Sequence, residues 1–211
     1  MADPAHSLDE QVRAADPDRW LSSRFVADER LRADLIALYA FEAELLAIPT
    51  RVTQPLLAEM RYVWWREQMD GVFAGVPRRG HPVLEALTDI VARHGLDRAP
   101  FDALIEAHIG RVHGEPHDLD AFYVGPMQTA VRVLGAENPH HAVPAGRAWG
   151  LMQTGRFEEA RAALPDAART ARTLPVGAFP AVLPATLARR PDAGPTQKRL
   201  RLLWAAVRGR L

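Results

Sequence analysis

The chain has 211 residues, of which 48% are hydrophobic and 25% charged, a composition that suits one globular domain with a sizeable core. Its 26 basic and 26 acidic side chains cancel to a formal net charge of zero, which excludes the bulk basic character expected of a nucleic-acid-binding protein. The absence of cysteine excludes disulfides and thiol chemistry. No apolar run reaches the length of about 18 residues that a membrane-spanning helix requires.

The first 17 residues are polar and contain two Asp-Pro pairs, which predicts a flexible N-terminal tail. This start, MADPAHSLDE, lacks the basic residues and the apolar segment of a secretory signal, so we expect a cytoplasmic protein. Residues 18–211 are expected to form a single helical domain.

The first long helix is expected between Asp28 and Pro49. The carboxylate of Asp28 can accept hydrogen bonds from backbone N–H groups of a first helical turn. Pro49 has no N–H and disfavours helical angles at the residue before it, so the helix is expected to stop there. Its apolar face, spaced by three and four residues, consists of Leu31, Leu35, Leu38, Phe41 and Leu45.

Three further helices are each expected to begin near a proline, which a first helical turn tolerates. The first begins near Pro55. The second begins at Pro82 and ends before Gly95, because glycine suits the left-handed conformation that follows a helix. The third follows Pro100, and a shortened helix is expected over residues 121–134.

Between these helices, the segment RVHGEPHDLDAFY, residues 111–123, concentrates side chains that can bind metal ions. The HxExH spacing that begins at His113 occurs in metal sites, but Pro116 breaks any helix that would align these ligands. We therefore interpret the segment as a polar loop in which Asp118 caps the next helix.

Residues 146–172 are expected to form one or two helices. Within them, AWGLMQTGRFEEARAALPDA resembles a single tetratricopeptide helix pair. No second copy occurs at the required period of about 34 residues, so we interpret the likeness as chance.

The C-terminal stretch TQKRLRLLWAAVRGRL is amphipathic and basic. We expect this helix to pack on the domain with its charged side in water. The alternative is contact of residues 196–211 with an anionic membrane surface or with a partner's groove. The apolar stripe of this helix consists of Leu200, Leu203, Trp204 and Val207.

The sequence contains three phrases that resemble the squalene/phytoene synthase family: DRWLSSRFVADERLRADLIALYAF, PLLAEMRYVWWREQMDGVFAG and HPVLEAL. The resemblance covers residues 18–118 and resumes at GRAWGL and FPAVLPATLARR. It implies an all-α fold, a single-domain helical bundle of the isoprenoid (trans-prenyl transferase) synthase type, truncated near the second family motif. Active members enclose a central cavity and condense two isoprenoid diphosphates with two Asp-rich motifs on facing helices.

Both Asp-rich motifs are missing from this chain. A diphosphate leaving group needs Mg²⁺, and Mg²⁺ needs carboxylate ligands about one helical turn apart. The places of the first motif hold Leu46, Ala47 and Thr50. The stretch for the second offers Glu158 and Glu159, which are adjacent and therefore point in different directions on a helix. We predict no catalytic residue and no metal ligand; Mg²⁺ would be a cofactor only for an active transferase.

The resemblance also implies a set of cavity-facing candidates, because active members bind diphosphate and carbocations with basic and aromatic groups. The candidates are Arg24, Tyr39, Glu42, Trp65, Arg66 and Asp118. A simpler interpretation is that Tyr39 and Trp65 fill a core and that Arg66 pairs with Glu42 or Glu44 across the two helices. We prefer it, because without a metal these groups would not expel diphosphate.

One degenerate branch of the family, that of assembly factor 6 of respiratory complex I, lacks the first motif but keeps LYAF and the WWR phrase. The chain resembles that branch more than the active synthases. We therefore expect a non-catalytic binding or assembly factor for a membrane complex, peripheral on the inner membrane. Its candidate partners are a protein of that complex and an apolar or isoprenoid ligand.

Two alternatives remain. One is an active isoprenoid diphosphate condensing transferase whose unorthodox ligands would be Glu42, Glu44, Glu115 and Asp118. The other is a helical-repeat adaptor unrelated to the synthase scaffold, in which residues 28–113 would form a regular stack of antiparallel helix pairs.

Overall fold

The computed structural model describes residues 8–211, and every regular element in that range is helical. The α-helices are α1 (Leu8–Ala15), α2 (Pro17–Ser23), α3 (Glu29–Arg51), α4 (Pro55–Phe73), α5 (Pro82–His94), α6 (Ala99–Val112), α7 (Gly125–Val133), α8 (Val143–Gln153), α9 (Phe157–Ala171), α10 (Phe179–Val182) and α11 (Pro195–Arg208). A π-turn at Asp120–Val124 and 3-10 turns at Pro139–Ala142, Val176–Ala178 and Leu183–Arg189 connect them. Among the described helices, none combines the length and apolarity needed to cross a membrane.

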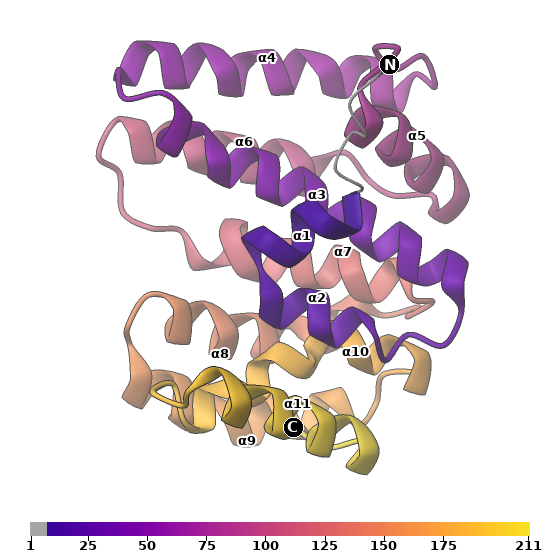
Figure 1. Cartoon of the computed structure of the whole chain (residues 1–211), viewed down its shortest axis with the longest axis vertical. Helices are drawn as coiled ribbons and strands as arrows, with labels where there is room; N and C mark the ends of the chain where they lie inside the picture. The colour runs from indigo at the N-terminus through magenta and orange to yellow at the C-terminus, as the bar shows by residue number, and fades with distance from the viewer. Residues whose placement is uncertain (1–7) are drawn as a thin grey trace.

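The helices stack in layers along the longest axis of the molecule, from α4 at one end to α9 and α11 at the other (Figure 1). Helix α3 crosses the middle, where α1, α2, α5 and α7 pack against it. Asp28 caps α3 as predicted, because its carboxylate accepts hydrogen bonds from the N–H groups of Arg30 and Leu31 at 2.8 and 2.9 Å. The all-α prediction is confirmed.

The prediction that this helix stops at Pro49 is wrong, since α3 continues to Arg51. The ring of Pro49 removes the N–H that would bond to the carbonyl of Leu45. The buried hydroxyl of Tyr62, on α4, donates to that carbonyl instead, at 3.2 Å. The cost of a proline inside the helix is therefore offset by a hydrogen bond from the neighbouring helix, and only the last turn lies beyond it.

Part of the segment predicted as a flexible tail is also helical, because residues 8–15 form α1. Val12 is buried, and α1 packs on α3. Asp9 anchors α1 to α2 by accepting hydrogen bonds from the indole of Trp20 at 2.9 Å and from Arg24 at 2.5 Å. Residues 1–7, the rest of that prediction, lie outside the described residues.

The middle helices follow the sequence signals. Helix α4 begins at Pro55 and α5 begins at Pro82, while Gly95 ends α5 in the left-handed conformation with φ of 57°. Helix α8 then packs against the π-turn Asp120–Val124. A Cβ atom on Gly146 would lie 2.8 Å from the Cα of Val124, so only glycine permits this approach.

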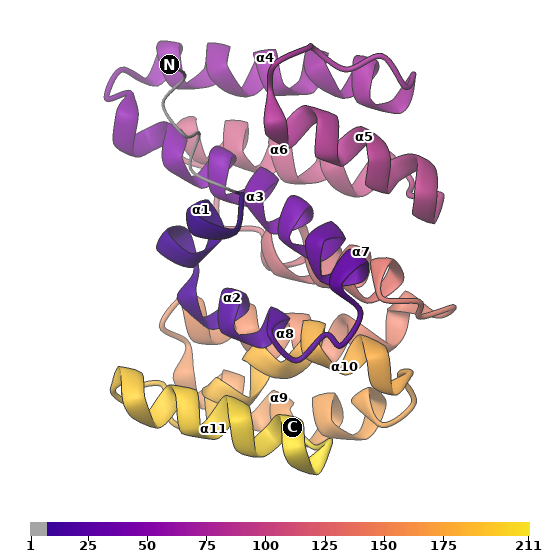
Figure 2. The same cartoon turned by 45° about the vertical axis from the view of Figure 1, so that its right-hand side comes forward.

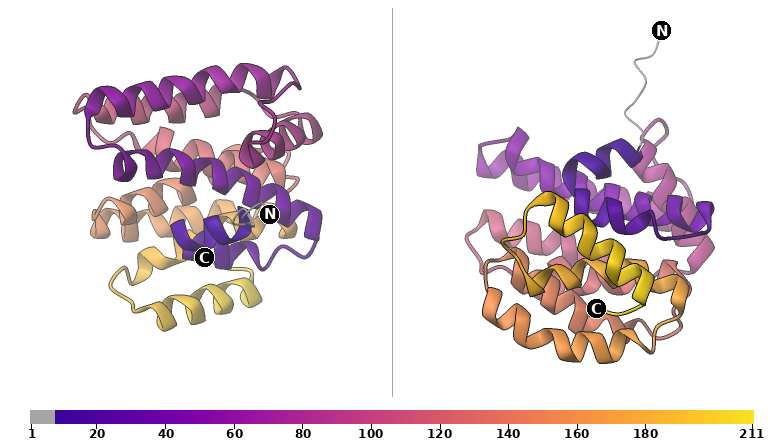
Figure 3. Two further views of the ribbon diagram at one scale, coloured as in Figure 1. Left: turned by 45° about the horizontal axis from the view of Figure 1, so that its top comes forward. Right: turned by 60° about the horizontal axis from the view of Figure 1, so that its bottom comes forward.

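Helix α11 packs on the domain as expected, but through a different face from its predicted apolar stripe. Leu202 and Ala205 are buried against the turn Leu183–Arg189. The small side chain of Ala205 allows α11 to pack close to this turn. The stripe faces outward instead, with Trp204 58% exposed and Val207 73% exposed. Figure 3 shows α11 on the outside of the molecule.

Candidate functional site

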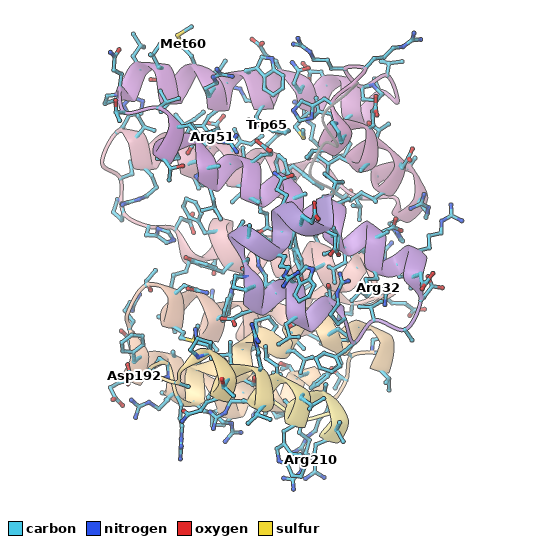
Figure 4. The ribbon with its side chains drawn as sticks, viewed as in Figure 1. Arg32, Arg51, Met60, Trp65, Asp192 and Arg210 are labelled. Carbon is cyan, nitrogen blue, oxygen red and sulfur yellow. The ribbon has the colours of Figure 1, made fainter. Side chains whose placement is uncertain are left out.

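The six residues proposed to face a common cavity do not converge. Only Tyr39, Glu42 and Trp65 are in the interior, with exposed fractions of 3%, 4% and 4%. Trp65 lies between α3 and α4 (Figure 4), where its ring meets that of Phe41 edge-on at 5.5 Å between centroids. It fills the core, as the simpler interpretation predicted.

The remaining three candidates lie at or near the surface. Arg24 is half-buried and pairs with Asp9. Arg66 binds Glu106 of α6 at 2.5 Å, so its predicted pairing with Glu42 or Glu44 is wrong. Asp118 caps the turn that follows it, accepting from backbone N–H groups at 2.9 and 3.1 Å, which confirms its structural interpretation.

A buried ionic cluster occupies the seam between α2 and α3. The guanidinium of Arg19 donates to Glu42 at 2.5 Å and to Asp16 at 2.6 Å. It also lies over the ring of Tyr39, 4.6 Å from the centroid. One carboxylate oxygen of Glu42, Oε1, is buried and has no hydrogen-bond partner.

Burial dominates the electrostatics of this cluster. It raises the pKa of Glu42, with the nearby Arg19 opposing the shift and Asp16 adding to it. Burial also raises the pKa of Tyr39 well above its ordinary value, again opposed by Arg19. For Arg19 itself burial acts to lower the pKa, but the carboxylates of Glu42 and Asp16 outweigh it and raise the pKa above the ordinary value. The cluster is thus a tightly held ion pair with one spare carboxylate oxygen.

The space beside Glu42 is too small for a lipid. Its cavity, shared with Phe101 of α6 and Thr129 of α7, has a volume of about 10 Å³. This volume is about that of one water molecule by the same kind of measure. An isoprenoid chain would therefore have to displace core side chains to enter here.

The carboxylates proposed for the transferase alternative are held apart by other partners. Glu44 accepts from Gln11 at 2.6 Å and pairs with Arg51 at 3.3 Å, whereas Glu42 is engaged by Arg19. Within residues 8–211, no group of three or more histidine, aspartate or glutamate side chains is arranged to hold a metal ion.

The places of the two family motifs also lack such a group. Leu46 and Thr50 are exposed on the last turns of α3. Glu158 and Glu159 form separate ion pairs, with Arg161 at 3.0 Å and with Arg156 at 2.5 Å, in keeping with the prediction that they point apart.

A second buried polar group stacks among aromatic rings between α4, α6 and the π-turn. The ring of His108 lies parallel to that of Tyr62 at 5.0 Å and edge-on to Phe122 at 4.7 Å. Burial, with a contribution from His117, lowers the pKa of His108 to about 4. At neutral pH His108 is therefore an uncharged member of the core.

Sequence reasoning missed Arg19, the partner of Glu42 in the interior, and Asp16, the second carboxylate that Arg19 binds. Asp16 accepts from the backbone N–H of Arg19 at 2.8 Å and caps α2, whose first residue is Pro17. The Asp-Pro pair that was interpreted as part of a tail is thus the N-terminal signal of a helix, which is the signal that could have located both residues.

Comparison with known proteins places the chain in a family. A family model described as squalene/phytoene synthase matches residues 12–156, which is more than half of the chain. Searches of curated proteins and of solved structures found no match. The matched range contains the buried cluster, the aromatic stack around His108 and the place of the first acidic motif. The chain therefore belongs to the squalene/phytoene synthase family.

Proposed function

We propose that the chain is a non-catalytic member of this family that acts by binding, as an accessory or assembly factor for a membrane complex. The observation that carries the proposal is the state of the interior. The cavity beside Glu42 measures about 10 Å³, and no metal-binding cluster occurs within residues 8–211. A prenyl transferase needs room for two isoprenoid chains and ligands for Mg²⁺, and the small cavity beside Glu42 and the described carboxylates supply neither.

Isothermal titration with Mg²⁺ and farnesyl diphosphate tests the loss of catalysis. We expect no metal-dependent binding and no release of pyrophosphate on incubation. Strong Mg²⁺-linked binding would contradict the proposal. Pyrophosphate release that disappears in Glu42→Ala would instead favour the transferase alternative.

The membrane side of the proposal is supported by α11. The outward stripe borders a cavity of about 520 Å³ that is lined by Leu200, Trp204, Arg190 and Arg201. Burial lowers the pKa of Arg201, and the neighbouring Arg190 and Arg189 lower it further, while one of its guanidinium nitrogens is buried without a partner. Exposed apolar side chains beside crowded cations are the combination that inserts at an anionic lipid surface.

Flotation with vesicles that contain phosphatidylglycerol tests this contact. The variant Leu203→Ser/Trp204→Ser removes two exposed stripe residues and should lose most vesicle association. The control Phe157→Ser/Val176→Ser removes two exposed apolar side chains outside α11 and should retain it. Equal association of the two variants would show that α11 is not the contact.

A further inference from the structure

A large basic cavity lies at the end of the molecule opposite α11. It has a volume of about 660 Å³ and opens between the last turns of α3, the middle of α4 and the segment 74–81. Figure 2 shows this segment running back along α4 before α5 begins, and Figure 4 shows Arg51 beside the space between α3 and α4. The residues that give the cavity its chemistry are Arg51, Arg61, Arg78, Arg79, Trp64 and His81.

The four arginines bring more positive charge than their surroundings neutralise. The cavity is lined by one acid, Glu44, which pairs with Arg51 at 3.3 Å. Arg61 and Arg79 form no ion pair with any residue in the described part of the chain, and Arg78 lies over the ring of Trp64 at 5.8 Å. Like charges gathered in a concave surface repel one another and attract an anion.

A second observation points to a ligand as well. The Nδ1 atom of His81 is buried and has no hydrogen-bond partner. Its ring packs edge-on against buried Trp65, at 5.3 Å between centroids, which fixes its orientation. In the tautomer that carries its hydrogen on Nδ1, this nitrogen is a donor, which is the role that an oxyanion requires.

We propose that this cavity binds a multiply charged phosphate-bearing ligand without the help of a metal ion. Guanidinium groups match phosphate oxygens through two parallel donors, and the half-buried Trp64 offers a flat surface to the organic part of the ligand.

The cavity is separate from the place of the first acidic motif. Glu44, Ile48 and Arg51 lie on one face of α3, whereas Leu46, Ala47 and Thr50 lie about a third of a turn away. The proposal does not rest on the proposed function, because it needs neither membrane contact nor the loss of catalysis.

Titration of the full chain with inorganic tripolyphosphate, in the presence of a metal chelator, tests the site. The variant Arg61→Gln/Arg79→Gln removes the two unpaired cations and should weaken binding about tenfold or more. The control Arg30→Gln/Arg172→Gln makes the same change in net charge at two exposed residues outside the cavity. Equal weakening in both variants, or no binding by the unaltered chain, would overturn the proposal. Thermal melting of each variant verifies that it folds.

The source of the phosphate is distinguished by vesicles. The starting point is Leu203→Ser/Trp204→Ser, so that α11 does not mask the result. If residual association with vesicles that contain phosphatidic acid, whose phosphate is a monoester and can carry two charges, disappears when Arg61→Gln/Arg79→Gln is added, the site takes a lipid headgroup. If tripolyphosphate binds and vesicle association is unaffected, the ligand is a free phosphate compound. Failure of tripolyphosphate to bind overturns the site, whatever the outcome with farnesyl diphosphate and Mg²⁺.

Discussion

The ion pair between Arg19 and Glu42 gives the most direct test of how the interior is held together. The two side chains are 13% and 6% exposed, and their closest atoms lie 2.5 Å apart. The change Arg19→Met leaves a buried carboxylate without its cation and should lower the free energy of unfolding by about 3–5 kcal/mol. The milder change Glu42→Gln keeps an acceptor for Arg19, which also retains Asp16, and should lower it by about 1 kcal/mol.

Urea unfolding followed by circular dichroism measures these differences. The double variant Arg19→Met/Glu42→Leu replaces both charges with apolar groups and should recover most of the loss in Arg19→Met. If Arg19→Met changed the free energy of unfolding by less than about 1 kcal/mol, the pair would not support the seam between α2 and α3. A double variant as unstable as the sum of two single losses would contradict the reasoning equally.

The pH dependence of the same variants follows from the raised pKa of Glu42. The folded state keeps the Glu42 proton to a higher pH than the unfolded state, so folding binds protons in the window above the ordinary value of 4.5. This group therefore makes stability fall as pH rises through that window. The fall should extend to higher pH in Arg19→Met, because the cation that opposes the shift is gone, and it should be absent from Glu42→Gln.

Three further changes test other parts of the core. Tyr62→Phe leaves the buried carbonyl of Leu45 without a hydrogen-bond donor and should lower the free energy of unfolding by about 1–3 kcal/mol in urea melts. The loss should be much smaller when Tyr62→Phe is combined with Pro49→Ala, because alanine restores the helical N–H. Burial and His117 lower the pKa of His108 from 6.5 to about 4, so the folded protein resists protonation of this side chain. The free energy of unfolding should therefore fall as pH decreases through that window, by up to about 3 kcal/mol. The fall should be absent from His108→Phe. Gly146→Ala forces a Cβ against Val124 and should lower the melting temperature by an amount equivalent to about 1–3 kcal/mol, whereas Gly177→Ala, whose nearest neighbour is 4.0 Å away, should not.

The fold could largely be predicted from the sequence, because helix ends depend on local chemistry. The cap at Asp28, the start at Pro55 and the end at Gly95 each follow from which backbone groups one residue can satisfy. The continuation past Pro49 could not be predicted in this way, because its compensation comes from Tyr62, a residue on another helix.

The site was less predictable for the same reason. The burial of Glu42 depends on Arg19, which lies 23 positions earlier in the sequence. No periodicity within α3 identifies that partner. The basic cavity is similar, because it forms only when the segment 74–81 returns along α4 and brings Arg78 and Arg79 to the side chains of Arg51 and Arg61.

The orientation of α11 leaves its largest apolar side chains outside the fold. A helix that packed only for stability would be expected to bury its largest apolar residues, since each fully buried leucine or valine contributes about 1.5–3 kcal/mol. Here the buried face holds Leu202 and Ala205, while Trp204 stays outside with Arg208 over its ring at 4.2 Å. Packing among residues 8–211 therefore does not account for the stripe, whose apolar side chains stay exposed in that range. Because cations flank the stripe, the arrangement is in keeping with the anionic lipid surface that we propose as the contact of α11.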